Sequence, residues 1–431
     1  MFTKHLSFLS RAVKPAFDKA IKAGYVRSLS KLAAKPPSIS SVTPLKAGRG
    51  VEVVWDDGER SIFHSSWLRM NCSCGKCMQA ASGQRTISLK YIPEHILLEA
   101  LDISADSKEI SIRWKDENHN STFPLRWLKE HSYSDKDIAM QGLERKPLPY
   151  QGEGSPSMEY REMSDSDEGL LKYLRHLNEY GISVLTGVPK NVHVTQVARK
   201  FGPVLETIYG RDFQVISQPN PINIAYSDVN LPFHVDLAYY QSPPGLQLLH
   251  CVRFDKQVVG GESIFLDLFA VAEEFRKTNP QEFNTFLRVP ATFQKIHFER
   301  EYPVYMKYQR PHIVLNHRDE IVAVTWSPAF EGPLFAREED VEPYYEAYRK
   351  FDKAVNKSPL KLKLKLNEGD LVTFNNIRML HGRKAFQLND GVRQLDGCYV
   401  NIDEFRNKLD VLSQTVGDGR LSKRVGNGCF F

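Results

Sequence analysis

The strongest constraint on how this chain folds is a run of strict alternation near its end. Residues 361–366 read Lys-Leu-Lys-Leu-Lys-Leu, a period of two that puts one face of a strand in solvent and the other in a core. Asn367–Asp370 then predicts a turn into the apolar segment 371–376. Short apolar segments separated by Gly, Pro and Asn recur through about the last 250 residues. We therefore expect a mainly β fold with flanking helices, arranged as a barrel or jelly roll.

Helical periodicity interrupts this β-rich region in a few places. Apolar residues recur at helical spacing over 168–180, ahead of an apolar strand at 182–185. Further helices are predicted at about 268–288 and 338–357. We interpret 164–415 as one large domain of strands with helices on its faces.

A smaller unit precedes this domain, and the 431 residues leave room for both. Residues 51–63 alternate and turn at Asp-Asp-Gly, which predicts a hairpin, and a similar unit returns at 109–123. We expect 46–135 to form a small β-rich domain whose strands bracket a group of cysteines. Pro, Gly, Ser and charged residues dominate 136–163, which is typical of a linker, and 416–431 is expected to be a C-terminal tail.

Positive charge is concentrated at the start of the chain. The net charge is +5, but residues 1–44 hold eight Lys and Arg against Asp18, so the remainder carries about −2. That balance disfavours a folded surface for nucleic acid, and no apolar run approaches the roughly 20 residues of a membrane span. Residues 1–45 are basic, Ser-rich and nearly acid-free. They predict a mitochondrial transit peptide, or else a disordered basic tail on a cytoplasmic protein.

One short motif predicts a metal site in the β-rich region. His234 and Asp236 lie two residues apart in His-Val-Asp, so on a strand both side chains project from one face. His381 follows 145 residues beyond Asp236, just after a predicted strand. Together they would form a 2-His-1-carboxylate triad, which holds Fe(II) in oxygenases and leaves positions open for a co-substrate and O₂.

Two further features suit a dicarboxylate co-substrate. Arg393 lies 12 residues after His381, where the next strand would face the same site, and its planar fork matches a carboxylate. A surface salt bridge is the alternative for this arginine considered alone. Between the ligands, Gly260–Ser263 offers a tight turn and the Ser263 hydroxyl for the same co-substrate.

The cysteine spacing predicts a second metal site. The chain holds six cysteines: Cys72, Cys74, Cys77, Cys251, Cys398 and Cys429. Three fall within six residues, too close to pair with one another as a disulfide framework, which favours a reducing compartment and a metal site. The hairpin at 109–123 brings His119, and Cys₃His is typical of a closed structural Zn²⁺ site. His95 or His131 could replace His119, and three cysteines without metal are the other alternative. A zinc finger that reads nucleic acid is disfavoured by spacing and charge.

Several motifs keep a common order and spacing: Tyr209–Gly210, Asn223–Tyr226, Phe233–Asp236, Pro244–Gly245 through His250–Cys251, and Leu380–Arg383. In these motifs, and from about residue 46 to about 412, the chain resembles the γ-butyrobetaine dioxygenase and trimethyllysine dioxygenase family, and it is closer to the former. The resemblance implies a double-stranded β-helix, Fe(II) bound by the triad, 2-oxoglutarate held by Arg393 and Ser263, and zinc on the cysteine loop. It also implies a need for ascorbate to keep iron reduced.

The resemblance further implies a substrate site. A cage for a trimethylammonium group would be formed by Tyr209, Phe213, Tyr226 and Tyr399, because aromatic faces attract a quaternary cation. The alternative is that these are ordinary core aromatics. The family has Trp where Phe213 stands, and its pair of asparagines that help hold a substrate carboxylate is replaced here by Ser327–Pro328. Ser327 can donate one hydrogen bond, and Asn223 remains as another candidate contact.

The expected activity is oxidative decarboxylation of 2-oxoglutarate coupled to hydroxylation of a small trimethylammonium substrate. γ-Butyrobetaine, giving L-carnitine, is the favoured substrate. Trimethyllysine is the alternative, supported by Glu206–Arg211 and by the basic first segment. A catalytically silent binding or sensor protein on the same fold, or a zinc-dependent interaction module, would be expected to lack part of the triad or Arg393, and all are present. A homodimer is one assembly that the resemblance leaves open.

Overall fold

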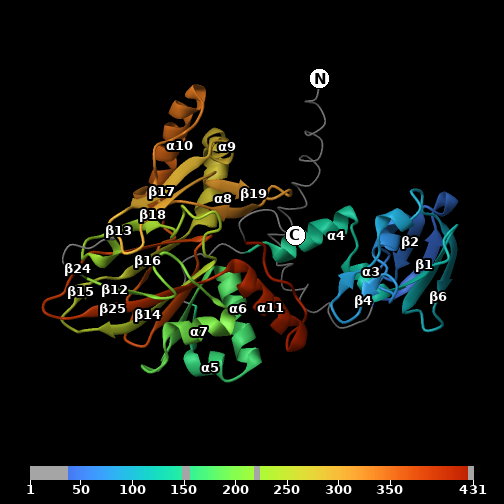
Figure 1. Cartoon of the computed structure of the whole chain (residues 1–431), viewed down its shortest axis with the longest axis horizontal. Helices are drawn as coiled ribbons and strands as arrows, with labels where there is room; N and C mark the ends of the chain where they lie inside the picture. Colours follow the sequence, from blue (N-terminus) through green and yellow to red (C-terminus); the bar gives the residue numbers. More distant parts are fainter. Residues whose placement is uncertain (1–36, 148–155, 218–223, 426–431) are drawn as a thin grey trace. The chain divides into compact units, whose positions relative to one another are not determined.

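The computed structural model describes residues 37–147, 156–217 and 224–425 (Figure 1). The chain divides into two compact units, Met1–Leu143 and Glu144–Phe431. Most of the predicted transit segment, residues 1–36, lies outside the described residues. Within the described part, no helix has the length and apolar character needed to cross a membrane.

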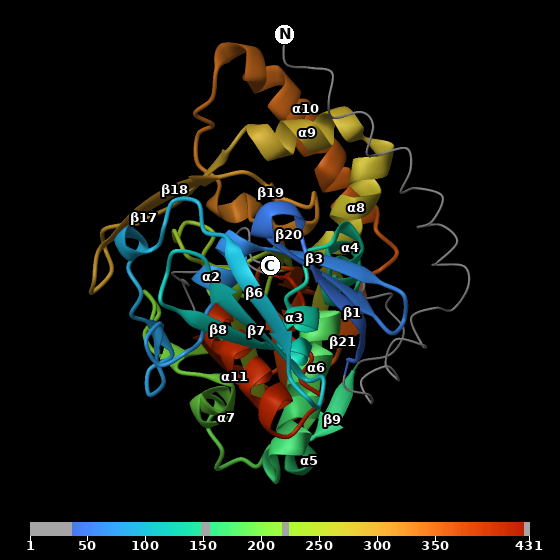
Figure 2. The same cartoon turned by 90° about the vertical axis from the view of Figure 1, so that its right-hand side faces the viewer.

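The smaller unit repeats one motif of three strands and a short helix (Figure 2). The first copy comprises β1 (Ile39–Pro44), β2 (Gly50–Trp55), β3 (Arg60–His64) and α2 (Ser65–Met70). The second comprises β6 (Leu98–Ile103), β7 (Glu109–Trp114), β8 (Asn120–Pro124) and α3 (Leu125–Glu130). Each set of strands is an antiparallel sheet, and the short pair β4 (Met78–Gln79) and β5 (Gln84–Arg85) lies between the copies in sequence.

Each copy buries a tryptophan whose indole N–H is paired with a serine. Trp55 and Trp114 are at most 2% exposed, and each indole N–H donates to a buried serine hydroxyl, Ser61 or Ser121, at 2.9 Å. A buried indole needs such a partner, because an unsatisfied N–H would cost its hydration. The serine follows six residues after Trp55 and seven after Trp114, so the same side-chain pairing recurs in both copies of the unit.

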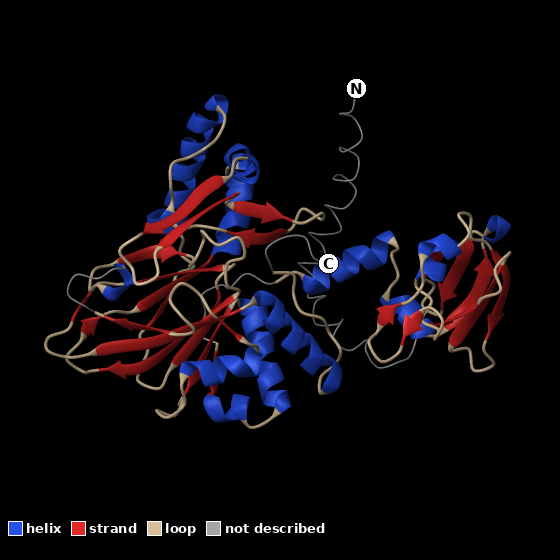
Figure 3. Cartoon of the chain, in the orientation of Figure 1, coloured by secondary structure: helices blue, strands red, loops and turns tan. Residues whose placement is uncertain are grey.

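The larger unit is a double-stranded β-helix, as predicted (Figure 3). Its major sheet has the order β11-β25-β14-β22-β10-β9, with β12 also pairing with β25. These strands are β9 (Ser157–Glu159), β10 (Ile182–Thr186), β11 (Val204–Leu205), β12 (Phe213–Ile216), β14 (Leu246–Phe254), β22 (Leu371–Asn375) and β25 (Arg393–Val400). The minor sheet has the order β13-β23-β16-β21, formed by β13 (Leu231–His234), β16 (Ser263–Asp267), β21 (Leu362–Leu364) and β23 (Met379–Arg383).

A hydrophobic core fills the space between the two sheets. Phe265 of the minor sheet meets Phe374 of the major sheet with ring centroids 5.1 Å apart. Leu362 and Leu366 join this core at 7% and 5% exposure, whereas Lys363 between them is exposed. The alternation at 361–366 therefore marks a half-buried strand, as expected.

Helices cover the outside of the barrel. A second core joins the major sheet to α5 (Tyr160–Ser164), α6 (Asp167–Tyr180), α7 (Val194–Phe201) and α11 (Ile402–Thr415) (Figure 1). A third core joins the minor sheet to α8 (Leu268–Thr278), α9 (Pro280–Arg288) and α10 (Glu338–Lys357). The hairpins β17 (Ala291–His297) with β18 (Val304–Arg310) and β19 (Ile313–Leu315) with β20 (Ile321–Val324) lie beside these helices, and β15 (Val259–Gly260) pairs with β24 (Phe386–Gln387).

Three segments differ from expectation. The helix predicted at about 268–288 is broken at Asn279, because Pro280 cannot continue the preceding helix and instead begins α9. The predicted linker 136–163 contains most of α4 (Asp135–Arg145), β9 and α5, with 148–155 outside the described residues. In the predicted tail, Arg424 is 1% exposed and its Nε donates to Glu320 at 2.7 Å, so this part of the tail packs into the larger unit.

Candidate active site and metal centres

Two strands of the minor sheet bring the predicted iron ligands face to face. β13 and β23 are antiparallel, and their register pairs His234 directly with His381. The two imidazole rings lie 4.2 Å apart between centroids and are 8% and 7% exposed. Gly382 permits this close approach, since a Cβ there would lie 2.7 Å from the Leu231 carbonyl oxygen. Strand register therefore joins residues that are far apart in sequence.

Asp236 follows β13 in a turn that Asn376 holds from both sides. The Asn376 side chain accepts a hydrogen bond from the Asp236 N–H at 2.8 Å and donates to the Asp236 carbonyl at 3.0 Å. Leu237 next to it adopts a left-handed backbone with φ of 57°, which costs an L-residue roughly 1–2 kcal/mol. The carboxylate lies 3.4 Å from His234 Nε2 and 3.7 Å from His381 Nε2.

Hydrogen bonds and burial set the protonation of these three side chains. His234 Nδ1 lies 2.8 Å from the Pro232 carbonyl, which can only accept, so Nδ1 carries a proton and Nε2 is the nitrogen that faces Asp236. Burial pulls the pKa of Asp236 upward, but the two histidines and the Tyr399 hydroxyl, which donates to Oδ2 at 2.8 Å, hold that pKa below its ordinary value. Burial, with the adjacent His234, lowers the pKa of His381 to about 3. The site thus presents a carboxylate and, at His381, a neutral imidazole.

This arrangement fits a metal ion. One ligand atom from each of His234, Asp236 and His381 lies within 4.8 Å of the other two. Two imidazole nitrogens and one carboxylate oxygen are the donor set of non-haem Fe(II) sites, which leave the remaining positions open. The donor set therefore fits iron with room for a co-substrate.

Arg393 is a buried cation without a carboxylate partner among the described residues. It begins β25, is 3% exposed, and donates from Nη2 to the Gly261 carbonyl at 3.3 Å, while its Nε has no partner. The rings of Phe254 and Phe386 lie 5.6 and 5.4 Å from its guanidinium. Burial lowers the pKa of Arg393 to about 10. Because an uncompensated buried charge is costly, this environment fits an anionic ligand such as the distal carboxylate of 2-oxoglutarate.

Ser263 and Arg383 lie opposite each other in the β16–β23 ladder. Ser263 is 6% exposed. Arg383 donates to the carbonyl oxygens of Ala225, Ser227 and Val229 at 2.8, 2.6 and 2.8 Å. These bonds fasten the segment 225–229 to the strand that carries His381. Burial, and after it the charge of Arg393, lowers the pKa of Arg383 to about 10, so the two guanidinium groups are electrostatic neighbours.

Three of the predicted cage residues form a continuous aromatic cluster. Ring centroids are 6.0 Å apart for Tyr209 and Phe213, and 5.2 Å apart for Phe213 and Tyr399. Phe213 covers Gly397, where an added Cβ would lie 2.4 Å from the Phe213 ring. Tyr226 belongs to the short turn Ile224–Tyr226; burial, followed by the charge of Asp236, raises its pKa. All four aromatics therefore lie around the Asp236 carboxylate or contact a residue that does.

The remaining predicted substrate contacts have different outcomes. The Tyr399 hydroxyl donates a hydrogen bond to the Asp236 carboxylate, so Tyr399 also orients a predicted iron ligand. Ser327 is fully buried and its hydroxyl has no hydrogen-bond partner in the described structure. It follows Trp326, whose carbonyl accepts from the Val235 N–H at 2.9 Å, between two predicted iron ligands. Asn223 lies outside the described residues.

Two positioning residues were missed from the sequence. Asn376 holds the Asp236 backbone and Arg383 holds the segment with Tyr226. A signal existed for Asn376, since two asparagines directly after an apolar strand are buried polar groups that need partners. For Arg383 the nearness to His381 gave no indication of its carbonyl partners, which come from more than 150 residues earlier.

The cysteine loop and the β7–β8 turn form the second cluster. His119 Nε2 lies 3.3, 3.7 and 3.5 Å from the sulfurs of Cys72, Cys74 and Cys77. The four ligand atoms lie within 4.8 Å of one another, which fits a closed tetrahedral zinc site. Burial, and after it Cys72, raises the pKa of Cys77 to about 11. A bound cation would stabilise the Cys77 thiolate. Arg69, which donates to Cys77 Sγ at 3.5 Å, acts in the same direction.

The alternative fourth ligands lie outside this cluster. His95 is exposed, and His131 stacks on Trp127 with ring centroids 4.3 Å apart. Cys251 and Cys398 are buried free thiols, and Cys429 is outside the described residues. An open cavity of about 420 Å³ borders the cluster and is lined by Cys74, Gly75, Lys76, Asn118, His119 and Asn120.

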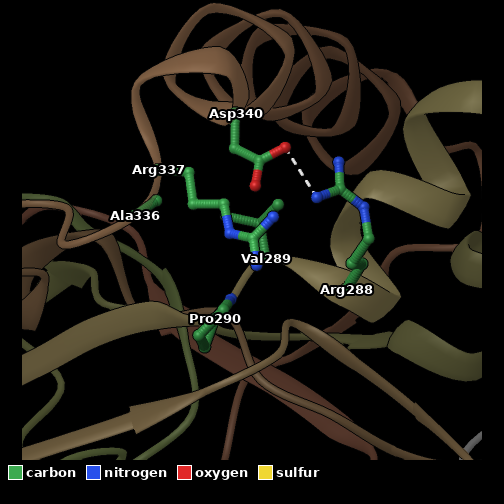
Figure 4. A pocket seen from close by; sticks show the side chains of 6 residues that line it. All are labelled: Arg288, Val289, Pro290, Ala336, Arg337 and Asp340. Carbon is green, nitrogen blue, oxygen red and sulfur yellow. Dashed lines mark ion pairs between the residues drawn. The ribbon is translucent and has the colours of Figure 1, made fainter.

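A separate cavity of about 360 Å³ lies between α9 and the start of α10 (Figure 4). Its lining is Arg288, Val289, Pro290, Ala336, Arg337 and Asp340, and Arg288 pairs with Asp340 at 2.6 Å. None of the predicted site residues lines it, and its charges are already paired or exposed. It has no part in the site described above.

Comparison with known proteins gives two family matches. Residues 144–399 match the family described as Taurine catabolism dioxygenase TauD, TfdA family. Residues 43–129 match Gamma-butyrobetaine hydroxylase-like, N-terminal. The first match covers most of the larger unit and the second covers most of the smaller unit. The sequence predicted the same order, with the small domain ahead of the large one.

Individual relatives extend these matches. A gamma-butyrobetaine dioxygenase from Pongo abelii is 31% identical over 89% of this chain and 99% of its own length. One from Pseudomonas sp. (strain AK-1) is 31% identical over 85% and 94%. The trimethyllysine dioxygenase, mitochondrial, of Rattus norvegicus is 27% identical over 81% and 82%. Among solved structures, a taurine dioxygenase from Burkholderia xenovorans aligns over 59% of this chain and 89% of that one, with 15% identity and a TM-score of 0.42.

Proposed function

Because the chain belongs to the γ-butyrobetaine and trimethyllysine dioxygenase family of 2-oxoglutarate-dependent dioxygenases, we propose that it hydroxylates a trimethylammonium acid, with γ-butyrobetaine as substrate and L-carnitine as product. One observation carries the reaction type. The β13–β23 register pairs His234 with His381 beside Asp236, and the buried Arg393, on β25 of the major sheet, has no carboxylate partner among the described residues.

His234, Asp236 and His381 would hold Fe(II), and Arg393 with Ser263 would hold 2-oxoglutarate. When bound, iron, 2-oxoglutarate and O₂ supply the oxidation, in which the co-substrate becomes succinate and CO₂ while a substrate C–H bond becomes C–OH. The chain supplies orientation. Tyr399 fixes the Asp236 carboxylate, Asn376 fixes its backbone, and the Pro232 carbonyl fixes the His234 tautomer.

The aromatic cluster supports the choice of a quaternary cation. A trimethylammonium group cannot donate hydrogen bonds, so aromatic faces are its means of recognition. Tyr209, Phe213 and Tyr399 supply these faces. The γ-butyrobetaine dioxygenases share 31% identity with this chain against 27% for the trimethyllysine enzyme, which favours the shorter acid.

An isosteric substrate tests this proposal. In the analogue, a neutral tert-butyl group replaces trimethylammonium at nearly equal shape, so slower hydroxylation would measure recognition of charge. Phe213→Trp should lower KM for the cation and Tyr226→Leu should raise it, each by about 2- to 30-fold, the range for one good cation–π contact. Equal turnover of the two compounds would show that these aromatics are ordinary core residues. Preference for trimethyllysine in the same assay would reassign the substrate.

We also infer a structural zinc ion bound by Cys72, Cys74, Cys77 and His119, and a requirement for ascorbate to keep iron reduced. Mitochondrial import through residues 1–45 is proposed from their basic, acid-poor composition. A reporter carrying this segment should enter mitochondria, and loss of Arg11, Lys14, Lys19 and Lys22 should prevent entry. A diffuse cytosolic signal from the intact segment would contradict import. A homodimer is compatible with this function and is tested by solution mass.

A further inference from the structure

Gln247 is a buried polar residue inside the barrel to which no role has been assigned above. It lies near the start of β14, within the motif that runs from Pro244 to Cys251, and is 3% exposed. Leu249 and Cys251, two and four residues further along the strand, pack into the core between the two sheets. Side chains two residues apart on a strand share one face. Gln247 therefore also points between the sheets, toward the minor sheet that carries the predicted iron histidines.

Strand register places Gln247 between two rings that each contact a predicted iron ligand. Gln247 lies directly opposite Tyr399 on β25 and Phe374 on β22. The Tyr399 hydroxyl donates to Asp236 at 2.8 Å, and the Phe374 ring lies 4.8 Å from the His381 ring between centroids. Opposed residues on antiparallel strands have Cβ atoms about 4.5–5.5 Å apart. The Gln247 side chain is therefore next to two groups that border the triad.

The side-chain amide of Gln247 has a buried oxygen without a hydrogen bond. Its Oε1 has no hydrogen-bond partner within the described part of the chain. A buried polar atom without a partner destabilises a fold, so a glutamine with a purely structural role would be expected to have a protein partner. A half-turn about the last side-chain bond exchanges the oxygen and the NH₂ group, so the same position can also donate. The amide is thus suited to a ligand that binds inside the barrel.

The chemistry around the triad indicates which ligand this is. Two other donors beside the triad are already committed, the Tyr399 hydroxyl to Asp236 and His234 Nδ1 to the Pro232 carbonyl. 2-Oxoglutarate has two carboxylates, and Arg393 is the proposed partner of the distal one alone. The other carboxylate is then available for the open positions of the iron site, where a neutral amide can donate to it. A trimethylammonium group can neither donate nor accept a hydrogen bond, so it is not a partner for an amide.

We propose that the Gln247 amide donates a hydrogen bond to the carboxylate of 2-oxoglutarate nearer the iron, so that Gln247 and Arg393 hold the two ends of the co-substrate. The inference rests on the proposed iron and 2-oxoglutarate sites, and it adds a ligand-binding residue to them. Because this hydrogen bond forms only when the co-substrate is bound, it contributes to the affinity for 2-oxoglutarate and not to the stability of the ligand-free fold.

Two measurements on Gln247→Met test the assignment, because a structural role and a ligand-binding role predict different results. In the iron-free protein this change removes a buried amide without a partner at nearly equal shape, so the unfolding temperature should be unchanged or higher. Anaerobic calorimetric titration of the Fe(II)-loaded protein should give a Kd for 2-oxoglutarate about 10- to 100-fold above the wild-type value. Gln214→Met, at an exposed glutamine of the neighbouring strand β12, is the control and should leave this Kd unchanged.

The outcomes separate the inference from the function on which it rests. If wild-type protein binds 2-oxoglutarate and Gln247→Met binds it equally well, the assignment is overturned and the proposed function stands. A clear fall in the unfolding temperature of iron-free Gln247→Met would show that the amide is paired within the fold, and would also overturn it. So would a raised KM for γ-butyrobetaine with an unchanged Kd for 2-oxoglutarate, because the amide would then contact the substrate. If Fe(II)-loaded wild-type protein does not bind 2-oxoglutarate, the proposed sites fail and the assignment fails with them.

Discussion

The two metal-ligand clusters are built in opposite ways. Three ligands of the zinc-type cluster lie within six residues, on a loop that follows α2 and has little regular structure. The ligands of the iron-type cluster lie up to 147 residues apart and are joined by the β13–β23 ladder. In the first cluster a bound ion would fix the conformation of the cysteine loop. In the second cluster the paired strands already position the ligands before an ion binds. We therefore expect the zinc ion to be required for stability and the iron ion for chemistry.

The number of ligands and the groups around them also distinguish the two clusters. The zinc-type cluster offers four ligands, which close a tetrahedral ion, and Arg69, which is paired with Glu117, also donates to Cys77 Sγ. The iron-type cluster offers three ligands, each positioned by another group: Pro232 for His234, Tyr399 and Asn376 for Asp236, and the β13 partner strand for His381. Open coordination with fixed ligands is what an oxygenase requires.

The largest expected effect would come from removing an iron ligand. His234→Ala, Asp236→Ala or His381→Ala should reduce succinate formation by far more than the roughly 10- to 100-fold typical of outer partners, because each removes one of three protein ligands. Thermal unfolding of the barrel should remain cooperative. The exposed His317 provides the control as His317→Ala. Near-normal turnover by His381→Ala would break the contrast between the clusters.

Loss of a zinc ligand should have the opposite pattern. Cys72→Ser, Cys74→Ser or Cys77→Ser should lower soluble yield and the unfolding temperature of the small unit, because a structural ion contributes folding free energy. Turnover per folded molecule should fall less than in the iron-ligand variants. His95→Ala, an exposed histidine outside the cluster, is the matched control. Purified protein without zinc under reducing, chelator-free conditions would contradict this prediction.

A variant of Tyr399 tests whether its hydroxyl positions the Asp236 carboxylate. Tyr399→Phe removes only the hydroxyl that donates to Asp236 at 2.8 Å and keeps the ring against Phe213. Iron affinity should weaken by about 10- to 100-fold, as is typical when an outer-shell partner is lost. Titration of the protein with Fe(II) under anaerobic conditions measures this change. Tyr302→Phe, at an exposed tyrosine, should leave iron affinity unaltered, and an equal loss there would refute the assignment.

The smallest expected effect is an acid response of the barrel that does not involve the ligands. His312 is fully buried between the Thr325 carbonyl and the Tyr344 hydroxyl, and burial lowers its pKa to about 4. The unfolded chain takes up the proton first, at about 6.5, so stability is complete above that pH and falls as pH drops toward 4. Between pH 7.5 and 5.5 the loss should be about 1 kcal/mol. Denaturant unfolding of His312→Gln should show a flatter pH dependence, and identical slopes would contradict this origin.

Patterns within a few residues were the ones that the sequence could predict. The alternation at 361–366, the helix at 338–357 and the spacing of His234 and Asp236 are local, and the structure contains the corresponding elements. Cys72, Cys74 and Cys77 are similarly local, so only the histidine was open among three candidates. Contacts set by strand register were not predictable from such patterns. Asn376 against Asp236, Arg383 against Ala225, and Gln247 beside Tyr399 all depend on which segments meet in space.

The most direct test of the central claim is the stoichiometry of one reaction. Purified full-length protein would be given Fe(II), 2-oxoglutarate, ascorbate, O₂ and γ-butyrobetaine, and both succinate and hydroxylated product would be quantified. We expect close to one molecule of L-carnitine for each succinate, with both products lost in His381→Ala. Succinate formation that neither γ-butyrobetaine nor trimethyllysine stimulates, with no hydroxylated product from either, would contradict it.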